Sequence, residues 1–404
     1  MSTPTTSPQQ GIDTTAEVSN IQKSAFDELL VAEYTPHTAW RMDYSINPDL
    51  YSTADSANGG TVVVDANRAK LSTSAAVNGI AHLETLRRVR YMPGIGGLAR
   101  FTCVFATPKA QTQQIIGPGN GADGFYFGYD ETDFGVLRRA AGVDYWTPRT
   151  DWNGTALTMD LNTSFGNIYQ IRYQWLGYGA IKFYIFDALE RALVLVHTID
   201  YANTSASVHT LNPSFPLSAE IKNTGNNTDM VMYTPSAVAG LEGDAEKNHV
   251  VHPLHVPRAA VAATSIADTN NNHLLSVQNK TLLNAQDNRV SVRVRSIVFS
   301  RENLTAVRGC TFRVYKGATT AGARTYADVS TAHSPVSTST TATTITGGTL
   351  VYQVTLPAGS SPFTVELDHD QVHLFPGDIL TVAVQDTNAN ATDVSVTVAY
   401  EELF

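Results

Sequence analysis

Three histidines have the spacing that could most readily build a metal site. His249, His252 and His255 recur at every third position, with Pro253 and Pro257 among them. A polyproline conformation has about three residues per turn and would bring the three imidazoles onto one side. Imidazole binds transition metals well, but no carboxylate or thiolate stands in register to complete a ligand set. The pattern favours an exposed or hydrogen-bonded linker, and we predict no metal and no cofactor.

Two acidic loops, residues 130–133 and 386–393, carry the oxygen ligands that calcium prefers. Neither has EF-hand spacing, and Asp and Asn also favour tight turns, so turn formation explains both loops better. The chain contains no Gly-Xaa-Ser-Xaa-Gly elbow, no His-Glu-Xaa-Xaa-His, no Cys-Xaa-Xaa-Cys and no Walker phosphate loop. The paired carboxylates of a glycoside hydrolase are defined by their separation in space, which sequence does not give. We therefore predict a protein that is not an enzyme.

Aromatic residues near predicted turns are candidates for sugar contact. An amphipathic ring can stack on a sugar, as in lectin-like sandwiches, although core packing is the more frequent use of such rings. The candidate glycan contacts are Tyr126, Tyr129, Trp146 and Trp152.

Residues 169–185 show the structural pattern that these candidates depend on. Tyr169, Ile171 and Tyr173 alternate with polar residues, a glycine-containing turn follows, and residues 181–185 alternate again. Strand side chains repeat every two residues, so this segment predicts a β-hairpin with one buried face and one solvated face of Gln, Arg and Lys.

Similar alternating runs, separated by turn signals, continue along most of the chain. They predict an all-β protein with two β-sandwich, jelly-roll-like domains, because 404 residues exceed what one hydrophobic core usually serves. We predict a docking arm at 1–39, a jelly-roll or lectin-like sandwich at 40–245, a linker at 246–257 and a second sandwich at 258–404. Within the last of these, the Ser/Thr-rich residues 334–349 read as a long loop.

The N-terminal arm combines an extended tract with a short helix. Residues 1–14 are too poor in apolar side chains to order by themselves, and residues 14–17 form a capping-box pattern before an apolar stripe at helical spacing. The stripe could dock on its own sandwich or on a neighbouring chain. The candidate anchoring residues are Ile12, Val18, Ile21 and Phe26.

Charge and apolar patterning exclude several partners. The 37 acidic residues against 27 basic give a net charge of -10, which would repel a phosphate backbone, so we predict no nucleic-acid partner. No apolar run approaches the roughly 20 residues of a membrane helix, and the N-terminus lacks the features of a secretory signal. We expect a soluble chain with no membrane partner. Cys103 and Cys310, in separate apolar patterns, predict buried thiols and not a disulfide.

Four segments resemble a family of virion structural proteins of tailed bacteriophages and some large DNA viruses. They are Arg90–Thr102, Asp123–Tyr129, Phe134–Arg139 and Tyr169–Ile185. The resemblance covers about residues 29–290, and the C-terminal sandwich resembles the end domain seen with that family. It implies no agreed catalytic residue and a component on the outside of the particle: a head decoration or fibre, or a tail or baseplate part.

That reading places the protein in the virion, after synthesis in the host cytoplasm. Its expected partners are other virion proteins and further copies of the chain in a homotrimer, since symmetric self-association is common. The alternative is a lectin-like receptor-binding protein that contacts host surface glycans. An enzyme that degrades surface polysaccharide is the third reading.

Overall fold

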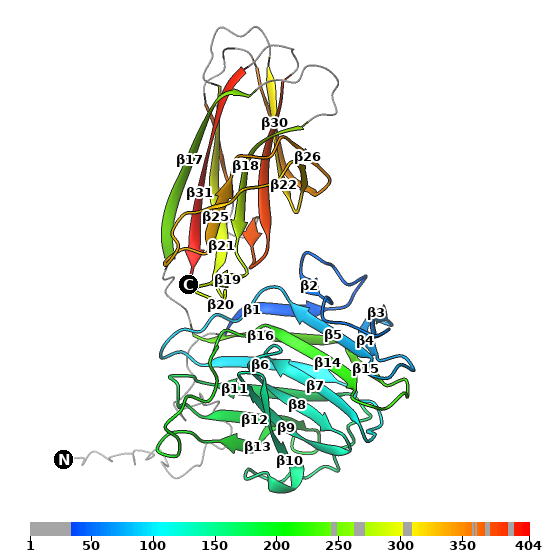
Figure 1. Ribbon diagram of the computed structural model, residues 1–404. Coiled ribbons are helices and arrows are strands. Elements are labelled where there is room, and N and C mark those ends of the chain that lie inside the picture. Colours follow the sequence, from blue (N-terminus) through cyan, green and yellow to red (C-terminus); the bar gives the residue numbers. More distant parts are fainter. Residues whose placement is uncertain are drawn as a thin grey trace, which may run out of the picture. The chain divides into compact units, whose positions relative to one another are not determined.

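The computed structural model describes residues 34–243, 249–261, 271–301, 309–357, 359, 362–367, 372–386 and 392–404. In these segments the regular structure is β-strand, apart from one short 3-10 helix, η1 (Arg149–Asp151). The chain divides into two compact units, Met1–Ala245 and Glu246–Phe404, and each is a β-sandwich (Figure 1). The predicted all-β fold with two sandwiches is therefore confirmed. The predicted helix and the anchoring candidates Ile12, Val18, Ile21 and Phe26 lie outside the described residues.

One layer of the first unit is a six-stranded antiparallel sheet. In spatial order its strands are β1 (Tyr34–Arg41), β16 (Ser236–Glu242), β6 (Gly97–Cys103), β11 (Asn167–Tyr173), β12 (Ile181–Asp187) and β13 (Ala192–Ile199). Pairing with β16 draws residues 34–39, which the sequence assigns to the arm, into the sheet. The predicted hairpin is confirmed as β11 and β12, with Tyr169 opposite Ile185.

The other layer is a seven-stranded sheet. Its spatial order is β10 (Val143–Pro148), β9 (Asp133–Ala140), β8 (Gly124–Asp130), β7 (Thr112–Pro118), β14 (Leu217–Asn223), β5 (Ile80–Thr85) and β2 (Tyr51–Ser52). A separate three-stranded sheet consists of β15 (Val231–Thr234), β4 (Arg68–Ser72) and β3 (Thr61–Asp65).

Aromatic rings from both layers pack together between the sheets. The ring of Phe127 on β8 lies 4.9 Å from Tyr169 and 5.4 Å from Phe183, centroid to centroid. All three side chains are buried. Because strand side chains alternate, this core fixes which face of the seven-stranded sheet points inward and leaves the intervening residues on its outer face.

The polar face of the β11–β12 hairpin is buried, whereas the alternation predicts a solvated face. Arg172 pairs there with Glu242, Nε to Oε1 at 3.2 Å, and both side chains are buried. Gln170 is also buried, and its Oε1 accepts hydrogen bonds from Nε and Nη2 of Arg100, at 3.0 and 2.6 Å. Hydrogen bonds and ion pairs of this kind offset the cost of burying polar side chains. The alternation of apolar and polar residues does not reveal such partners.

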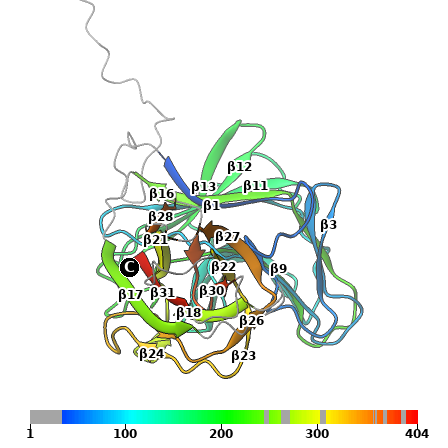
Figure 2. The same ribbon diagram turned by 90° about the horizontal axis from the view of Figure 1, so that it is seen from above.

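The second unit is also built from two main sheets, which form separate layers in Figures 1 and 2. One sheet has the order β17 (His249–Val261), β31 (Thr392–Leu403), β21 (Ser291–Arg301) and β28 (Phe363–Glu366), and β29 (His373–Leu374) also pairs with β21. The other has the order β23 (Thr319–Ala321), β26 (Thr344–Thr346), β18 (Asn271–Asn279), β30 (Ile379–Asp386), β22 (Cys310–Lys316) and β27 (Thr349–Leu356). Strand β25 (Val336–Ser339) pairs with β18 and with β24 (Ala327–Asp328), and β19 (Leu282–Leu283) pairs with β20 (Gln286–Asp287). Phe299 and Phe312 meet in the core, with ring centroids 4.9 Å apart.

Residues 249–257 form part of a strand, whereas the sequence predicts a linker at 246–257. Strand β17 pairs with β31 from His249, opposite Leu403, onwards. It lies at the edge of its sheet, where Pro253 and Pro257 are tolerated because an edge strand pairs on one side only. The predicted loop at 334–349 likewise contains β25 and β26, since threonine favours strands.

Cys103 and Cys310 are buried in separate units and are not joined in a disulfide, as the sequence predicts. Burial raises the pKa of the Cys103 thiol well above its usual value, so this sulfur behaves as a small apolar group. In the described segments, no helix has the length and apolar character needed to cross a membrane.

Candidate functional site

The four aromatic residues predicted to contact glycans do not form one surface. Tyr126 and Tyr129 point to opposite faces of β8, and both are buried. The Tyr126 hydroxyl donates to the carbonyl oxygen of Asn120 at 2.8 Å, and the Tyr129 hydroxyl lies 2.7 Å from Oγ1 of Thr163. Neither ring offers a stacking surface, so core packing, the alternative use, holds for both.

The two tryptophans are half-buried on opposite sides of the same sheet. Trp152 faces the core, with its ring centroid 6.1 Å from Phe127. Trp146 of β10 packs on the outer face, against a small cluster formed by Ile115, Tyr126 and Leu137. Of the four predicted glycan contacts, Trp146 is therefore the one that remains a candidate on the outer face.

The outer face of the seven-stranded sheet is concave. Strands β8 and β9 separate β7 from β10, so a flat sheet would hold β7 and β10 about 14 Å apart. Nevertheless, Nε2 of Gln113 on β7 donates to Oδ2 of Asp144 on β10 at 3.3 Å. Gly128 of β8 and Gly135 of β9 oppose each other between β7 and β10. A Cβ on Gly128 would lie 1.8 Å from the carbonyl oxygen of Gln114. Glycine therefore permits the close strand approach in the curved sheet.

An ion pair fixes the β9–β10 end of this concave face. Arg139 donates through Nε and Nη2 to the two carboxylate oxygens of Asp144, at 2.6 and 3.0 Å. Burial alone would raise the pKa of Asp144, but the hydrogen bond and charge of Arg139 outweigh it and lower that pKa. Asp144 is therefore an ionised carboxylate held in one orientation.

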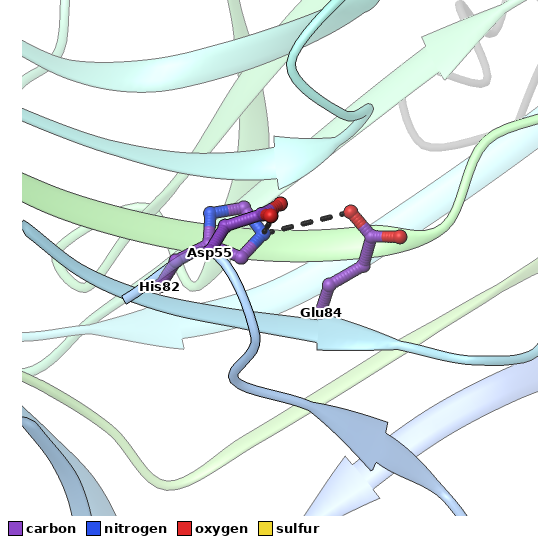
Figure 3. A group of neighbouring side chains, drawn as sticks. All are labelled: Asp55, His82 and Glu84. Atoms are coloured by element: carbon purple, nitrogen blue, oxygen red, sulfur yellow. Dashed lines mark ion pairs between the residues drawn. The ribbon is translucent and has the colours of Figure 1, made fainter. Parts of the chain in front are cut away.

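The β5 end of the concave face carries a histidine surrounded by carboxylates (Figure 3). His82 and Glu84 share the outer face of β5, and the pairing of β5 with β14 places Glu220 opposite His82. Nδ1 of His82 lies 3.3 Å from Oε2 of Glu220. Its Nε2 lies 3.5 Å from Oε2 of Glu84 and 3.9 Å from Oδ2 of Asp55, which comes from the connection between β2 and β3.

The charges in this cluster reinforce one another. Burial alone would lower the pKa of His82, but the neighbouring carboxylates of Glu220 and Glu84 raise it to about 9. Burial alone would raise the pKa of Glu220, but His82 and the charge of Lys222 lower it to about 2. Without a bound cation, His82 is therefore an imidazolium at neutral pH.

Three buried polar atoms on the concave face have no hydrogen-bond partner among the described residues. They are Oε1 of Gln113, Nε1 of Trp146 and Nε2 of His82. Buried polar atoms nearly always have partners, so each marks a place that a water, an ion or a ligand group can occupy. The amide oxygen accepts, the indole donates, and the imidazole nitrogen lies beside carboxylates. The face is therefore suited to hydroxyl-bearing ligands and to cations.

Sequence reasoning missed His82, Glu84 and Glu220, although a partial signal was present. All three are polar residues that alternate with buried apolar ones on β5 and β14, so each strand's outer face was recognisable. Their meeting depends on pairing between strands, with His82 and Glu220 138 positions apart. A single sequence does not give that pairing.

The other predicted ligand groups do not join this cluster. Residues 130–133 form the tight turn between β8 and β9, with Glu131 at a φ of 53°, as the turn reading predicts. Most of residues 386–393 lies outside the described residues, and so do the side chains of His249, His252 and His255.

No family model matches the sequence, and no curated protein is significantly similar to it. Among solved structures, it is similar to a glycosyl hydrolase family protein from Mycobacterium fortuitum, at 11% identity and a TM-score of 0.36, covering 52% of this chain and 100% of that one. It is also similar to the cellulose induced protein Cip1, at 15% identity, a TM-score of 0.33, and coverage of 47% and 89%. A third is the metal-free carbohydrate recognition domain of Emp46p, at 8% identity, a TM-score of 0.33, and coverage of 53% and 100%. Similarity at this level concerns the β-sandwich alone.

Proposed function

We propose that this chain is a non-enzymatic attachment protein of a virion, and that the concave face of its seven-stranded sheet binds carbohydrate. The observation that carries the binding role is that two buried polar atoms on that face, Oε1 of Gln113 and Nε1 of Trp146, have no hydrogen-bond partner among the described residues. Sugar hydroxyls both donate and accept, so they can satisfy an amide oxygen and an indole N–H together. A site with a few converging polar groups beside an aromatic ring is what sugars need.

Two polar side chains on this face, Gln113 and Asp144, are already held in one orientation. Gln113 is tied to Asp144, and Asp144 is tied to Arg139 through two hydrogen bonds. A ligand that binds ordered side chains loses less affinity to their ordering than one that must immobilise them. The arrangement therefore supports binding by a rigid surface.

Two carboxylates on this face, Glu220 and Asp144, support binding over hydrolysis. A glycoside hydrolase needs a carboxyl group with a raised pKa that can protonate the leaving oxygen. Glu220 and Asp144 are ionised and engaged in ion pairs, with the pKa of each lowered. Burial raises the pKa of Asp130, at the β8–β9 turn, so Asp130 is the acid that a hydrolytic reading would use.

The binding role can be tested with the full chain on an array of purified bacterial surface polysaccharides. Trp146→Phe keeps an aromatic ring and removes the donor, and we expect binding to weaken about threefold to tenfold, the effect of one neutral hydrogen bond of about 1 kcal/mol. Tyr145→Phe is the matched control, because Tyr145 neighbours Trp146 on β10 but its ring packs on Arg138, at 3.8 Å. Absence of binding, or an equal loss in both variants, would contradict the role. Release of reducing ends from a bound polysaccharide, abolished by Asp130→Asn, would instead establish an enzyme.

The virion role is supported by the sequence motifs that resemble external particle proteins, among them Arg90–Thr102 and Asp123–Tyr129. In this proposal the protein assembles as a homotrimer on other virion proteins and is anchored through its N-terminal residues. Mass spectrometry of purified particles should find the chain, and removal of residues 1–30 should leave a folded protein that particles no longer incorporate. Unimpaired incorporation of the shortened chain would remove the anchoring role, and absence of the full chain from particles would remove the virion role.

A further inference from the structure

Asp55, His82 and Glu84 each direct one ligand atom towards a common point at the β5 end of the concave face. These three atoms lie within 4.8 Å of one another. Figure 3 shows both ion-pair lines meeting at Nε2 of His82. We propose that these three residues bind a divalent transition-metal ion, with Zn²⁺ as the best fit.

The distances suit a tetrahedral ion. Zn²⁺ binds nitrogen and carboxylate oxygen at about 2.0–2.2 Å, which separates neighbouring ligand atoms by about 3.4 Å. Nε2 of His82 lies 3.5 Å from Oε2 of Glu84 and 3.9 Å from Oδ2 of Asp55. The histidine and Glu84 are therefore spaced as ligands already. Asp55, whose side chain is 75% exposed, is the ligand that has to move closer to the other two.

The histidine is oriented as a metal ligand. It is 4% exposed, and its Nε2 has no hydrogen-bond partner among the described residues. Its other ring nitrogen, Nδ1, faces Oε2 of Glu220 at 3.3 Å. Histidine ligands in proteins usually donate their second N–H to a carboxylate, which fixes the ring and leaves the remaining nitrogen free for the ion. Glu220 is in this position because β14 pairs with β5 in register.

The segment that carries Asp55 is tied to the strand that carries His82. Oγ of Ser56 accepts a hydrogen bond from the backbone N–H of His82 at 3.0 Å. Ala57 and Ile80 exchange two backbone hydrogen bonds, each 2.9 Å long. These bonds hold the neighbours of Asp55 against β5, so the third ligand is largely positioned before any ion arrives.

The donor set selects among ions. Calcium and magnesium prefer all-oxygen sites, whereas imidazole combined with carboxylates suits transition metals. Asp55 and Glu84 supply two negative charges that offset those of a divalent ion. A water can complete the tetrahedron at the side of Asp55. This proposal does not depend on carbohydrate binding.

Zinc titration of the metal-stripped full chain by isothermal calorimetry tests the site. Compared with the original protein, His82→Gln should lose one equivalent of bound Zn²⁺, which separates this site from binding by other histidines. Asp55→Asn should weaken the same equivalent at least tenfold, and Glu220→Gln should weaken it about tenfold to a hundredfold. Asp65→Asn is the control, because Asp65 is an exposed residue at the end of β3 and pairs with Arg68.

Two results would overturn the site. One is an original protein that binds no Zn²⁺. The other is a His82→Gln variant that binds as many ions, equally tightly, as the original. If His82→Gln does not fold, Asp55→Asn decides the question, since Asp55 is exposed and its replacement leaves the core intact. Unchanged zinc affinity in that variant would then refute the proposal.

Discussion

Replacing His82 by glutamine should change how the stability of the first unit depends on pH. His82 is buried and faces three carboxylates: Glu84 on its own strand, Glu220 on β14 and Asp55 on the connection after β2. The cations near these carboxylates include Lys222, 3.3 Å from Glu220, and Arg88, 3.8 Å from Glu84. This surrounding charge favours the protonated imidazole in the folded state only.

The magnitude follows from the pKa. The folded-state pKa of His82 is about 9, against an ordinary value of 6.5. A raised folded-state pKa means that the folded protein binds more protons than the unfolded chain between these values. The stabilisation is therefore complete below pH 6.5 and is lost as the pH rises to 9. At about 1.4 kcal/mol per pKa unit, the loss is about 3 kcal/mol.

The assay is urea unfolding followed by tryptophan fluorescence, in buffer with EDTA, at several pH values from 6 to 9. All four tryptophans, at positions 40, 146, 152 and 175, belong to the first unit, so fluorescence reports on that unit alone. Between the two ends of the range, the original protein should lose about 3 kcal/mol more unfolding free energy than His82→Gln. Parallel curves for the two proteins would refute the reasoning, because other titrating groups are common to both.

Two further substitutions test the sheets. Gly128→Ala should destabilise the first unit by about 1–3 kcal/mol or prevent its folding, because the added Cβ would lie 1.8 Å from the carbonyl oxygen of Gln114. Gly121→Ala, whose Cβ would have no atom within 4 Å, should have little effect, and equal effects would count against the close packing. Phe299→Ala should cost the second unit about 3–5 kcal/mol, visible as a shifted transition in calorimetry. The fluorescence transition should stay in place, because Phe299 belongs to the second core, and a matching shift there would contradict independent cores.

The sequence predicts correctly which side chains are buried wherever apolar and polar residues alternate along a strand and only the apolar face is covered. Tyr169, Ile171 and Tyr173 fall on the buried face of β11 because their spacing matches the strand period. Alternation fails where a polar face finds partners. Arg172 lies on the other face of the same strand, yet Glu242 from β16 allows it to be buried. The partner lies far along the chain, so the pattern cannot show it.

The candidate site was harder to predict than the fold. Tyr126 and Tyr129 were chosen for nearness to turns, but their strand is central enough that both rings are buried. The residues that do converge, His82 and Glu220, meet through strand pairing. Their types were visible in the sequence, whereas the pairing register is a property of the folded sheet.

Carbohydrate binding by the concave face can be followed directly by nuclear magnetic resonance of the tryptophan indole N–H groups. The probe is an oligosaccharide prepared from the polysaccharide that the array retains best. The Trp146 signal should shift on titration, because its N–H has no hydrogen-bond partner among the described residues. The signals of Trp40 and Trp175 should stay in place, since Thr234 and Thr210 accept their N–H groups at 3.2 and 3.0 Å. A stationary Trp146 signal with saturating oligosaccharide would show that this face does not bind carbohydrate.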